Sequence, residues 1–124
     1  MTGFGLAGHA LEMARGSNTT VRLELARVPL IEGVRGLAER GMVTGASGGN
    51  WAAYGHEAQL GAGLLAVDQA LLTDPQTSGG LLVACAPEAV PQALDVFARH
   101  GFAAAAEVGD IVATEPGGAR LKVF

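Results

Sequence analysis

Residues 20–25 read Thr20-Val21-Arg22-Leu23-Glu24-Leu25, so that polar and hydrophobic side chains alternate. This period of two is typical of a strand that buries one face. Just before it, hydrophobic side chains at helical spacing between Leu6 and Met13 predict a helix over residues 5–15. The first part of the chain is therefore expected to fold as a helix followed by a half-buried strand.

The rest of the chain continues this mixture of helices and strands. Spacing and turn residues predict, in order, a helix over 33–40, a loop over 44–50, a helix over 64–72, a buried strand over 81–85 and a helix over 87–100. The tail predicts a β-hairpin with strands over 108–114 and 120–124. Because helices and strands intermix and the chain ends in an antiparallel pair, the predicted fold class is α+β. We expect one layered domain over residues 1–124.

Composition limits the classes of function. Hydrophobic residues make up 49% of the chain, enough for a core that needs no disulfide or metal. The formal net charge of −4 and the scattered Lys and Arg residues argue against nucleic-acid binding. No apolar stretch approaches the roughly 20 residues of a membrane span. The single cysteine, Cys85, lies in the predicted buried strand, which indicates an inert core thiol. A lone cysteine cannot form an internal disulfide, which favours a cytoplasmic location.

The first candidate site is Thr2-Gly3-Phe4-Gly5-Leu6-Ala7-Gly8, at the start of the predicted helix. Its glycines fit the pattern G-x-G-x-x-G, in which main-chain N–H groups receive a phosphate. A dinucleotide fingerprint would also need a preceding strand, which the sequence does not offer. Two alternatives remain open: glycines that allow close helix packing, or a contribution to a shared phosphate or metal site.

The second candidate is Asp74-Pro75-Gln76-Thr77-Ser78-Gly79-Gly80. Two hydroxyls beside two glycines suit either an oxyanion or a tight turn, and composition alone favours the turn. No histidine or lysine stands nearby in sequence to activate Thr77 or Ser78 as a nucleophile.

The third candidate is Ser47-Gly48-Gly49-Asn50-Trp51. It is either a ligand loop or a surface connection anchored by Trp51, and its length favours the connection, because loops of this length lie on the surface by default. The chain's three histidines lack the close pairing of a zinc site, so we expect no metal there. They are His9, His56 and His100.

Two of these segments resemble the hallmark motifs of the selenophosphate synthetase (selenide, water dikinase) family. Residues 2–9, Thr-Gly-Phe-Gly-Leu-Ala-Gly-His, resemble the opening of that family's second domain. Residues 74–82, Asp-Pro-Gln-Thr-Ser-Gly-Gly-Leu-Leu, resemble its other hallmark, and residues 45–54 resemble its loop ending in Asn-Trp. Their order and spacing agree over nearly the whole chain. The chain is thus similar to a carboxyl-terminal domain of the superfamily that includes aminoimidazole ribonucleotide synthetase.

The resemblance implies an ATP-dependent enzyme. Members of the family convert selenide, ATP and water to selenophosphate, AMP and phosphate, and magnesium neutralises the phosphates. The product supplies selenium for selenocysteine. The implied partners are an amino-terminal ATP-binding domain and, for the full-length enzyme, a second subunit in a homodimer. A purine-synthesis or thiamine monophosphate kinase relative is the enzyme alternative.

The sequence also departs from the family pattern. The family's reactive Cys or selenocysteine, its lysine and its magnesium aspartates belong to an amino-terminal part that does not precede Met1. One aspartate would stand two residues before Thr2. We therefore expect a fragment that begins after the catalytic domain, holds no catalytic or metal residue and is inactive alone.

The residues expected to line a substrate or phosphate cleft come from all three candidate segments. They are Thr2, Gly3, Phe4, Gly5, Asn50, Thr77, Ser78, Gly79 and Gly80. The alternative from another functional class is a non-catalytic module whose loops only pack against a neighbouring domain or a partner protein.

Overall fold

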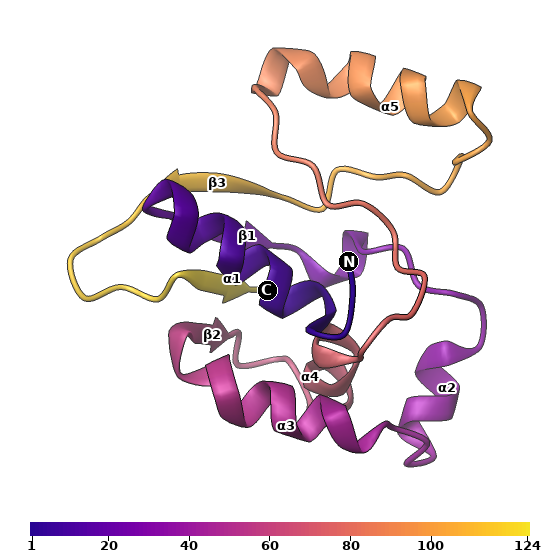
Figure 1. Cartoon of the computed structure of the whole chain (residues 1–124), viewed down its shortest axis with the longest axis vertical. Helices are drawn as coiled ribbons and strands as arrows, with labels where there is room; N and C mark the ends of the chain where they lie inside the picture. The colour runs from indigo at the N-terminus through magenta and orange to yellow at the C-terminus, as the bar shows by residue number, and fades with distance from the viewer.

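The computed structural model describes all residues from Met1 to Phe124. Its helices and strands intermix along the chain (Figure 1), which confirms the predicted α+β class. The α-helices are α1 (Gly5–Ser17), α2 (Val34–Glu39), α3 (Gly45–Tyr54), α4 (Ala66–Thr73) and α5 (Val90–Arg99). The strands are β1 (Thr19–Leu23), β2 (Ala58–Leu60), β3 (Gly109–Ala113) and β4 (Leu121–Val123). Short 3-10 helices are η1 (Leu25–Arg27), η2 (Gly55–Glu57) and η3 (Pro87–Ala89).

The four strands form one mixed sheet in the order β2-β4-β1-β3. β1 pairs antiparallel with β3 on one side and parallel with β4 on the other. The predicted hairpin is therefore wrong: both tail strands form, but β1 separates them. Alternation identifies a strand without identifying its partner. Here the Thr20 hydroxyl donates to the carbonyl oxygen of Ala119 over 2.9 Å and holds the connection between the tail strands close to β1.

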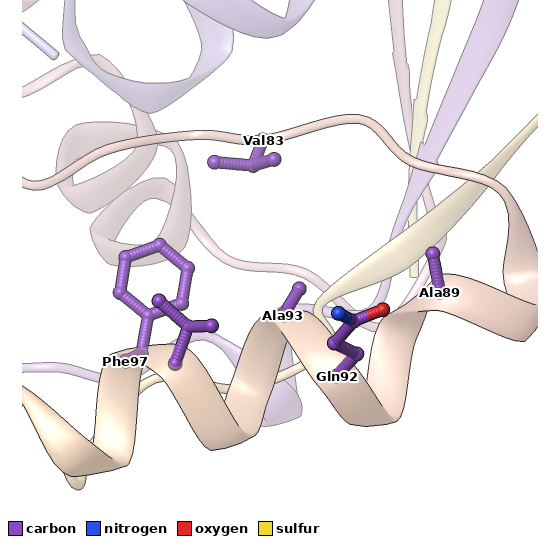
Figure 2. A pocket seen from close by; sticks show the side chains of 6 residues that line it. Val83, Ala89, Gln92, Ala93 and Phe97 are labelled. Carbon is purple, nitrogen blue, oxygen red and sulfur yellow. The ribbon is translucent and has the colours of Figure 1, made fainter.

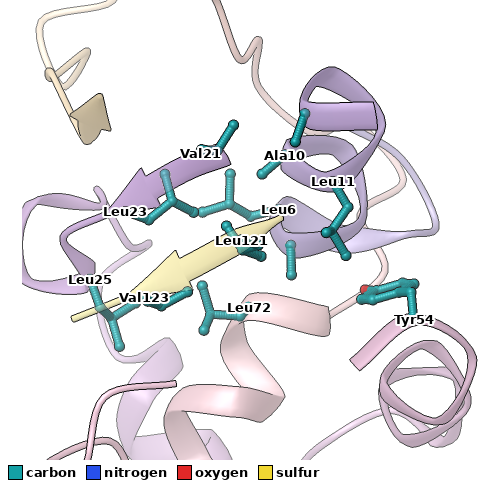
Figure 3. Packing of buried hydrophobic residues seen from close by; sticks show 12 residues of the cluster. Leu6, Ala10, Leu11, Val21, Leu23, Leu25, Tyr54, Leu72, Leu121 and Val123 are labelled. Atoms are coloured by element: carbon teal, nitrogen blue, oxygen red, sulfur yellow. The ribbon is translucent and has the colours of Figure 1, made fainter. Parts of the chain in front are cut away.

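One face of the sheet is buried under helices. α1 packs against β1 and β4, and α4 packs against α1. Leu11 of α1, Leu72 of α4 and Leu121 of β4 are at most 1% exposed at the centre of this core (Figure 3). The other face is polar, and Arg22 there forms an ion pair with its cross-strand neighbour Asp110. The sheet and the helices α1, α3 and α4 thus share one hydrophobic core, and α5 lies apart from it (Figure 1).

All four predicted helices are confirmed with shifted ends. The helix predicted over 87–100 becomes η3 followed by α5, and Pro91 lies in the first turn of α5, where no main-chain N–H is needed. α4 ends at Thr73, and the following Asp74 is extended because it precedes a proline. None of the helices combines the length and the apolar character that crossing a membrane requires.

The loop predicted over 44–50 is wrong, since α3 begins at Gly45. Three glycines and an asparagine disfavour a helix when only local preference is considered. Tertiary contacts override that preference: Ser47 is 4% exposed and its hydroxyl lies 2.6 Å from the Thr73 hydroxyl of α4. Tyr54, at the other end of α3, is 7% exposed.

The buried strand predicted over 81–85 is also wrong. This segment forms no strand, Val83 is 54% exposed and Cys85 is exposed, so the thiol is not a core residue. An apolar run cannot by itself distinguish a buried strand from an apolar connection. Here the run leads into η3 and α5, and Figure 2 shows Val83 across an open groove from Ala93 and Phe97 of α5.

Candidate functional site

Three segments that are distant in sequence meet at the start of α1. They are residues 1–5, residues 73–80 and helix α3. The carbonyl oxygen of Thr2 accepts a hydrogen bond from the main-chain nitrogen of Gln76 over 3.0 Å. The main-chain nitrogen of Met1 donates to the carbonyl oxygen of Gly80 over 2.5 Å. The structure thus brings together all three segments that the sequence singled out.

Asn50 joins these segments through its side-chain amide. Its Nδ2 donates to the carbonyl oxygen of Gly3 over 2.7 Å and to that of Thr73 over 2.9 Å. An amide nitrogen carries two hydrogens, so both are used by these bonds. Asn50, which the sequence assigned to a cleft wall, therefore acts in the structure as a bridge between the first segment and the end of α4.

Tyr54 supports the same junction from the last turn of α3. Its hydroxyl donates to the carbonyl oxygen of Phe4 over 2.6 Å. Burial raises the pKa of the Tyr54 phenol above its ordinary value, although an interaction with the Gly8 main chain opposes this shift. The phenol is therefore protonated at neutral pH and remains a donor to Phe4.

Close packing explains part of the first glycine motif. Gly5 has a φ of +69°, and a Cβ there would lie 2.8 Å from the carbonyl oxygen of Leu72. A Cβ on Gly8 would lie 2.7 Å from the Cβ of Phe4. Gly3 differs from both, because it is exposed, lacks a positive φ and has no atom within 4 Å of the position that a Cβ would occupy. Packing does not account for a glycine at Gly3.

The second motif also contains one closely packed glycine and several exposed residues. A Cβ on Gly79 would lie 2.5 Å from Oε1 of Gln76, so this glycine allows a close approach. Thr77 and Ser78 are exposed, and the hydroxyl of neither appears in any hydrogen bond within the chain. Gly80 is exposed, and a Cβ there would meet only the end of the Met1 side chain, at 3.7 Å. We refer to Gly3, Thr77, Ser78 and Gly80 as the open residues.

The charge of the site limits its chemistry. Within residues 2–5 and 73–80 the only charged side chain is Asp74, whose Oδ1 lies 3.4 Å from the Thr44 hydroxyl. No group of three or more His, Cys, Asp or Glu side chains lies close enough to hold a metal ion. The single lysine, Lys122, lies 3.5 Å from Glu115 on the tail. The side chains of these two segments offer neutral hydrogen-bond donors but no cation, and they do not fit a magnesium ion by themselves.

The individual roles of several residues of the site were not predicted from sequence, although Gln76 and His9 lie within the segments that the sequence singled out. Gln76 and Thr73 contribute main-chain groups, Tyr54 a phenol and His9 an imidazole to contacts with residues 2–4 and Asn50. Apart from the pair formed by His9 and Thr2, these contacts join residues more than 20 positions apart. No local spacing could have indicated them.

Comparison with known proteins identifies relatives over nearly the whole chain. Residues 1–122 match the family model described as AIR synthase related protein, C-terminal domain. A "Selenide, water dikinase" of Burkholderia pseudomallei (strain K96243) is 58% identical over 99% of this chain and 34% of its own length. Proteins of the same name from Pseudomonas straminea and Rhizobium meliloti (strain 1021) are 53% and 46% identical, over 94% and 100% of this chain. The chain spans about a third of the length of these relatives.

Proposed function

Because this chain belongs to the AIR synthase related protein family, as its C-terminal domain, we propose that it forms the carboxyl-terminal part of a selenophosphate synthetase. The names and identities of the relatives support this proposal, as do the two motifs that resemble that family. In this proposal the whole protein converts selenide, ATP and water to selenophosphate, AMP and phosphate. The chain supplies one wall of a site that it shares with an amino-terminal ATP-binding domain.

The observation that carries the proposal is the junction of the two motifs. Hydrogen bonds from Gln76 to Thr2 and from Asn50 to Gly3 hold the segments together. The same junction leaves the exposed Thr77 and Ser78 hydroxyls without a hydrogen bond inside the chain, and leaves open space beside the main chain of Gly3 and Gly80. Hydroxyls and main-chain N–H groups are suitable donors to phosphate or selenide-derived oxyanions. We infer that the open residues of this wall face substrate or phosphate.

The missing charge explains why the chain is proposed as only part of the enzyme. Phosphoryl transfer needs magnesium or basic side chains to neutralise the phosphates. The site has neither a cluster of metal ligands nor a lysine or arginine within its two motif segments. The proposal therefore assigns Mg²⁺ and the catalytic groups to the amino-terminal domain. A homodimer in the cytoplasm and inactivity of the isolated chain belong to the same proposal.

A fusion protein tests this function. We define it as the amino-terminal two thirds of the Burkholderia pseudomallei relative joined to this chain in place of its own carboxyl-terminal third. We expect the fusion protein to form AMP from MgATP only when selenide is present. The amino-terminal part alone and this chain alone are the controls, and both are expected to form none. ATP cleavage that follows aminoimidazole ribonucleotide precursors or thiamine monophosphate instead would assign the chain to another branch of the superfamily.

The non-catalytic alternative has a different outcome. If the chain were only a packing module, the amino-terminal part alone would form AMP with selenide as rapidly as the fusion protein does.

A further inference from the structure

His9 lies on α1, immediately after the first glycine motif, and is half-buried. Its Nε2 lies 3.0 Å from the main-chain nitrogen of Thr2 and 2.9 Å from the Thr2 hydroxyl. A main-chain nitrogen can only donate, so Nε2 must accept and carries no hydrogen. The neutral imidazole therefore has its hydrogen on Nδ1.

The same imidazole contacts a second residue of the motif. The rings of His9 and Phe4 meet edge to face, with their centroids 6.3 Å apart and an angle of 67° between their planes. Phe4 is 59% exposed, so it has few other contacts to fix its ring. One side chain of α1 thus holds both Thr2 and Phe4.

Fixing Thr2 also fixes the second motif. The Thr2 carbonyl oxygen accepts from the main-chain nitrogen of Gln76, immediately before Thr77 and Ser78. A chain of contacts therefore runs from His9 through Thr2 to the start of the open residues on the second segment. His9 has no contact of its own with Thr77 or Ser78 among the hydrogen bonds of the chain.

We propose that His9 is a positioning residue, whose unprotonated Nε2 sets the place of Thr2 and thereby of the site wall. This inference rests on the proposed function, which gives the wall its substrate. His9 acts through Thr2 and touches no reacting group. Its contribution is geometric, and misplacing a substrate-positioning segment lowers turnover more than binding when the correct geometry matters chiefly in the transition state.

Two amide substitutions test whether Thr2 needs a hydrogen-bond acceptor at the position of Nε2 or only a polar side chain at position 9. In His9→Gln the terminal amide group reaches about as far as Nε2, and its oxygen can accept from Thr2. In His9→Asn the amide ends near the position of Nδ1 and is too short to reach Thr2. The two variants have the same chemistry and differ in reach.

The experiment measures kcat and KM for selenide-dependent AMP formation by the fusion protein. We expect His9→Ala to lower kcat about tenfold and leave KM for ATP within about twofold. His9→Gln is expected to restore kcat to within about threefold of the unsubstituted protein, and His9→Asn to behave like His9→Ala. Thermal unfolding of each variant shows whether it is folded, and the comparison of Gln with Asn stands even if the alanine variant does not fold.

Unchanged kcat in His9→Ala, or equal recovery by His9→Asn and His9→Gln, would overturn the inference. If the unsubstituted fusion protein forms no AMP, the proposed function fails instead. Nitrogen NMR of the His9 ring in this chain then decides the inference separately. A hydrogen on Nδ1, with Nε2 coupled to the Thr2 amide, supports the inference, and a hydrogen on Nε2 contradicts it.

Discussion

The side-chain nitrogen of Asn50 lies 2.7 Å from the carbonyl oxygen of Gly3, although 47 positions separate the two residues. The same nitrogen donates to Thr73 at the end of α4. Together with the bond from the Tyr54 hydroxyl to Phe4, this pair of bonds connects α3 to the first motif and to the end of α4, just before the second motif.

Replacing the donors without changing the size of the side chain tests this bridge. We predict that Asn50→Asp lowers the free energy of unfolding by about 1–3 kcal/mol, because a carboxylate cannot donate and would face two carbonyl oxygens. Urea unfolding measures the change. The control is Gln92→Glu on α5, an exposed amide that makes no side-chain hydrogen bond within the chain and whose replacement should change stability by less than about 0.5 kcal/mol. Equal stability of the two variants would contradict the bridge.

Gly5 and Gly16 provide a second matched pair. Both are glycines of α1, but Gly5 has a φ of +69° and packs against Leu72, whereas nothing lies within 4 Å of a Cβ on Gly16. We predict that Gly5→Ala destabilises the chain by more than about 1 kcal/mol, and that Gly16→Ala is neutral or stabilises it by up to about 1 kcal/mol. Thermal unfolding of the two variants checks the difference, and a stable Gly5→Ala variant would contradict the close approach of α1 to α4.

The local features of the fold could be predicted from the sequence, whereas its long-range contacts could not. The spacing of Leu6 to Met13 and the alternation around Val21 are local, and both α1 and β1 form where these patterns indicate. The pairing of β1 with β3 and β4 depends on contacts about 90 to 100 positions away, which no local pattern contains. α3 forms despite its glycines because Ser47 and Tyr54 are buried against other segments.

The segments of the candidate site could be predicted from the sequence, but their spatial arrangement could not. The open residues Gly3, Thr77, Ser78 and Gly80 all belong to segments that the sequence marked by glycine and hydroxyl composition. Their convergence and the bridging hydrogen bonds of Asn50 depend on tertiary contacts, which no local sequence pattern contains. That these residues face a substrate stays a prediction, which activity measurements on the fusion protein address.

The stability of the folded chain should depend on pH through the carboxyl group of Asp68. It is 5% exposed, accepts from the Leu65 main-chain nitrogen over 2.8 Å, and lies 2.5 Å from Nη2 of Arg35. Burial opposes the charged form, but these two partners outweigh it and lower the pKa of Asp68 below its ordinary 3.8. Because the folded pKa is the lower one, the stabilisation is complete above the ordinary pKa and is lost as the pH falls through the folded pKa.

We therefore predict that Asp68→Asn lowers the free energy of unfolding by about 1–3 kcal/mol at pH 7. The difference from the unsubstituted chain should shrink as the pH falls below about 4, where the unfolded carboxylate takes up its proton. Urea unfolding at a series of pH values measures it. Asp95→Asn, which removes an exposed ion pair with Arg99, should cost less than about 1 kcal/mol. A difference for Asp68→Asn that is the same at every pH would contradict the assignment.

The reactivity of Cys85 tests whether residues 81–85 are exposed, as in the structure, or form the buried strand predicted from the sequence. Since the thiol is exposed, we predict that a disulfide reagent modifies one thiol per chain in the folded protein, at a rate within about tenfold of the unfolded chain. Absorbance of the released thiolate follows the reaction, and Cys85→Ser is the blank. Modification that requires denaturant would show that residues 81–85 are buried after all.

In our proposal the open residues form a wall of the active site, and substitutions of Thr77 and Ser78 test this role. Neither hydroxyl takes part in a hydrogen bond within the chain, so removing both should leave stability within about 0.5 kcal/mol. The measurement is selenide-dependent AMP formation by the fusion protein carrying Thr77→Val and Ser78→Ala. We predict that kcat/KM falls about tenfold or more while thermal unfolding is unchanged. Full activity of this double variant would contradict the claim.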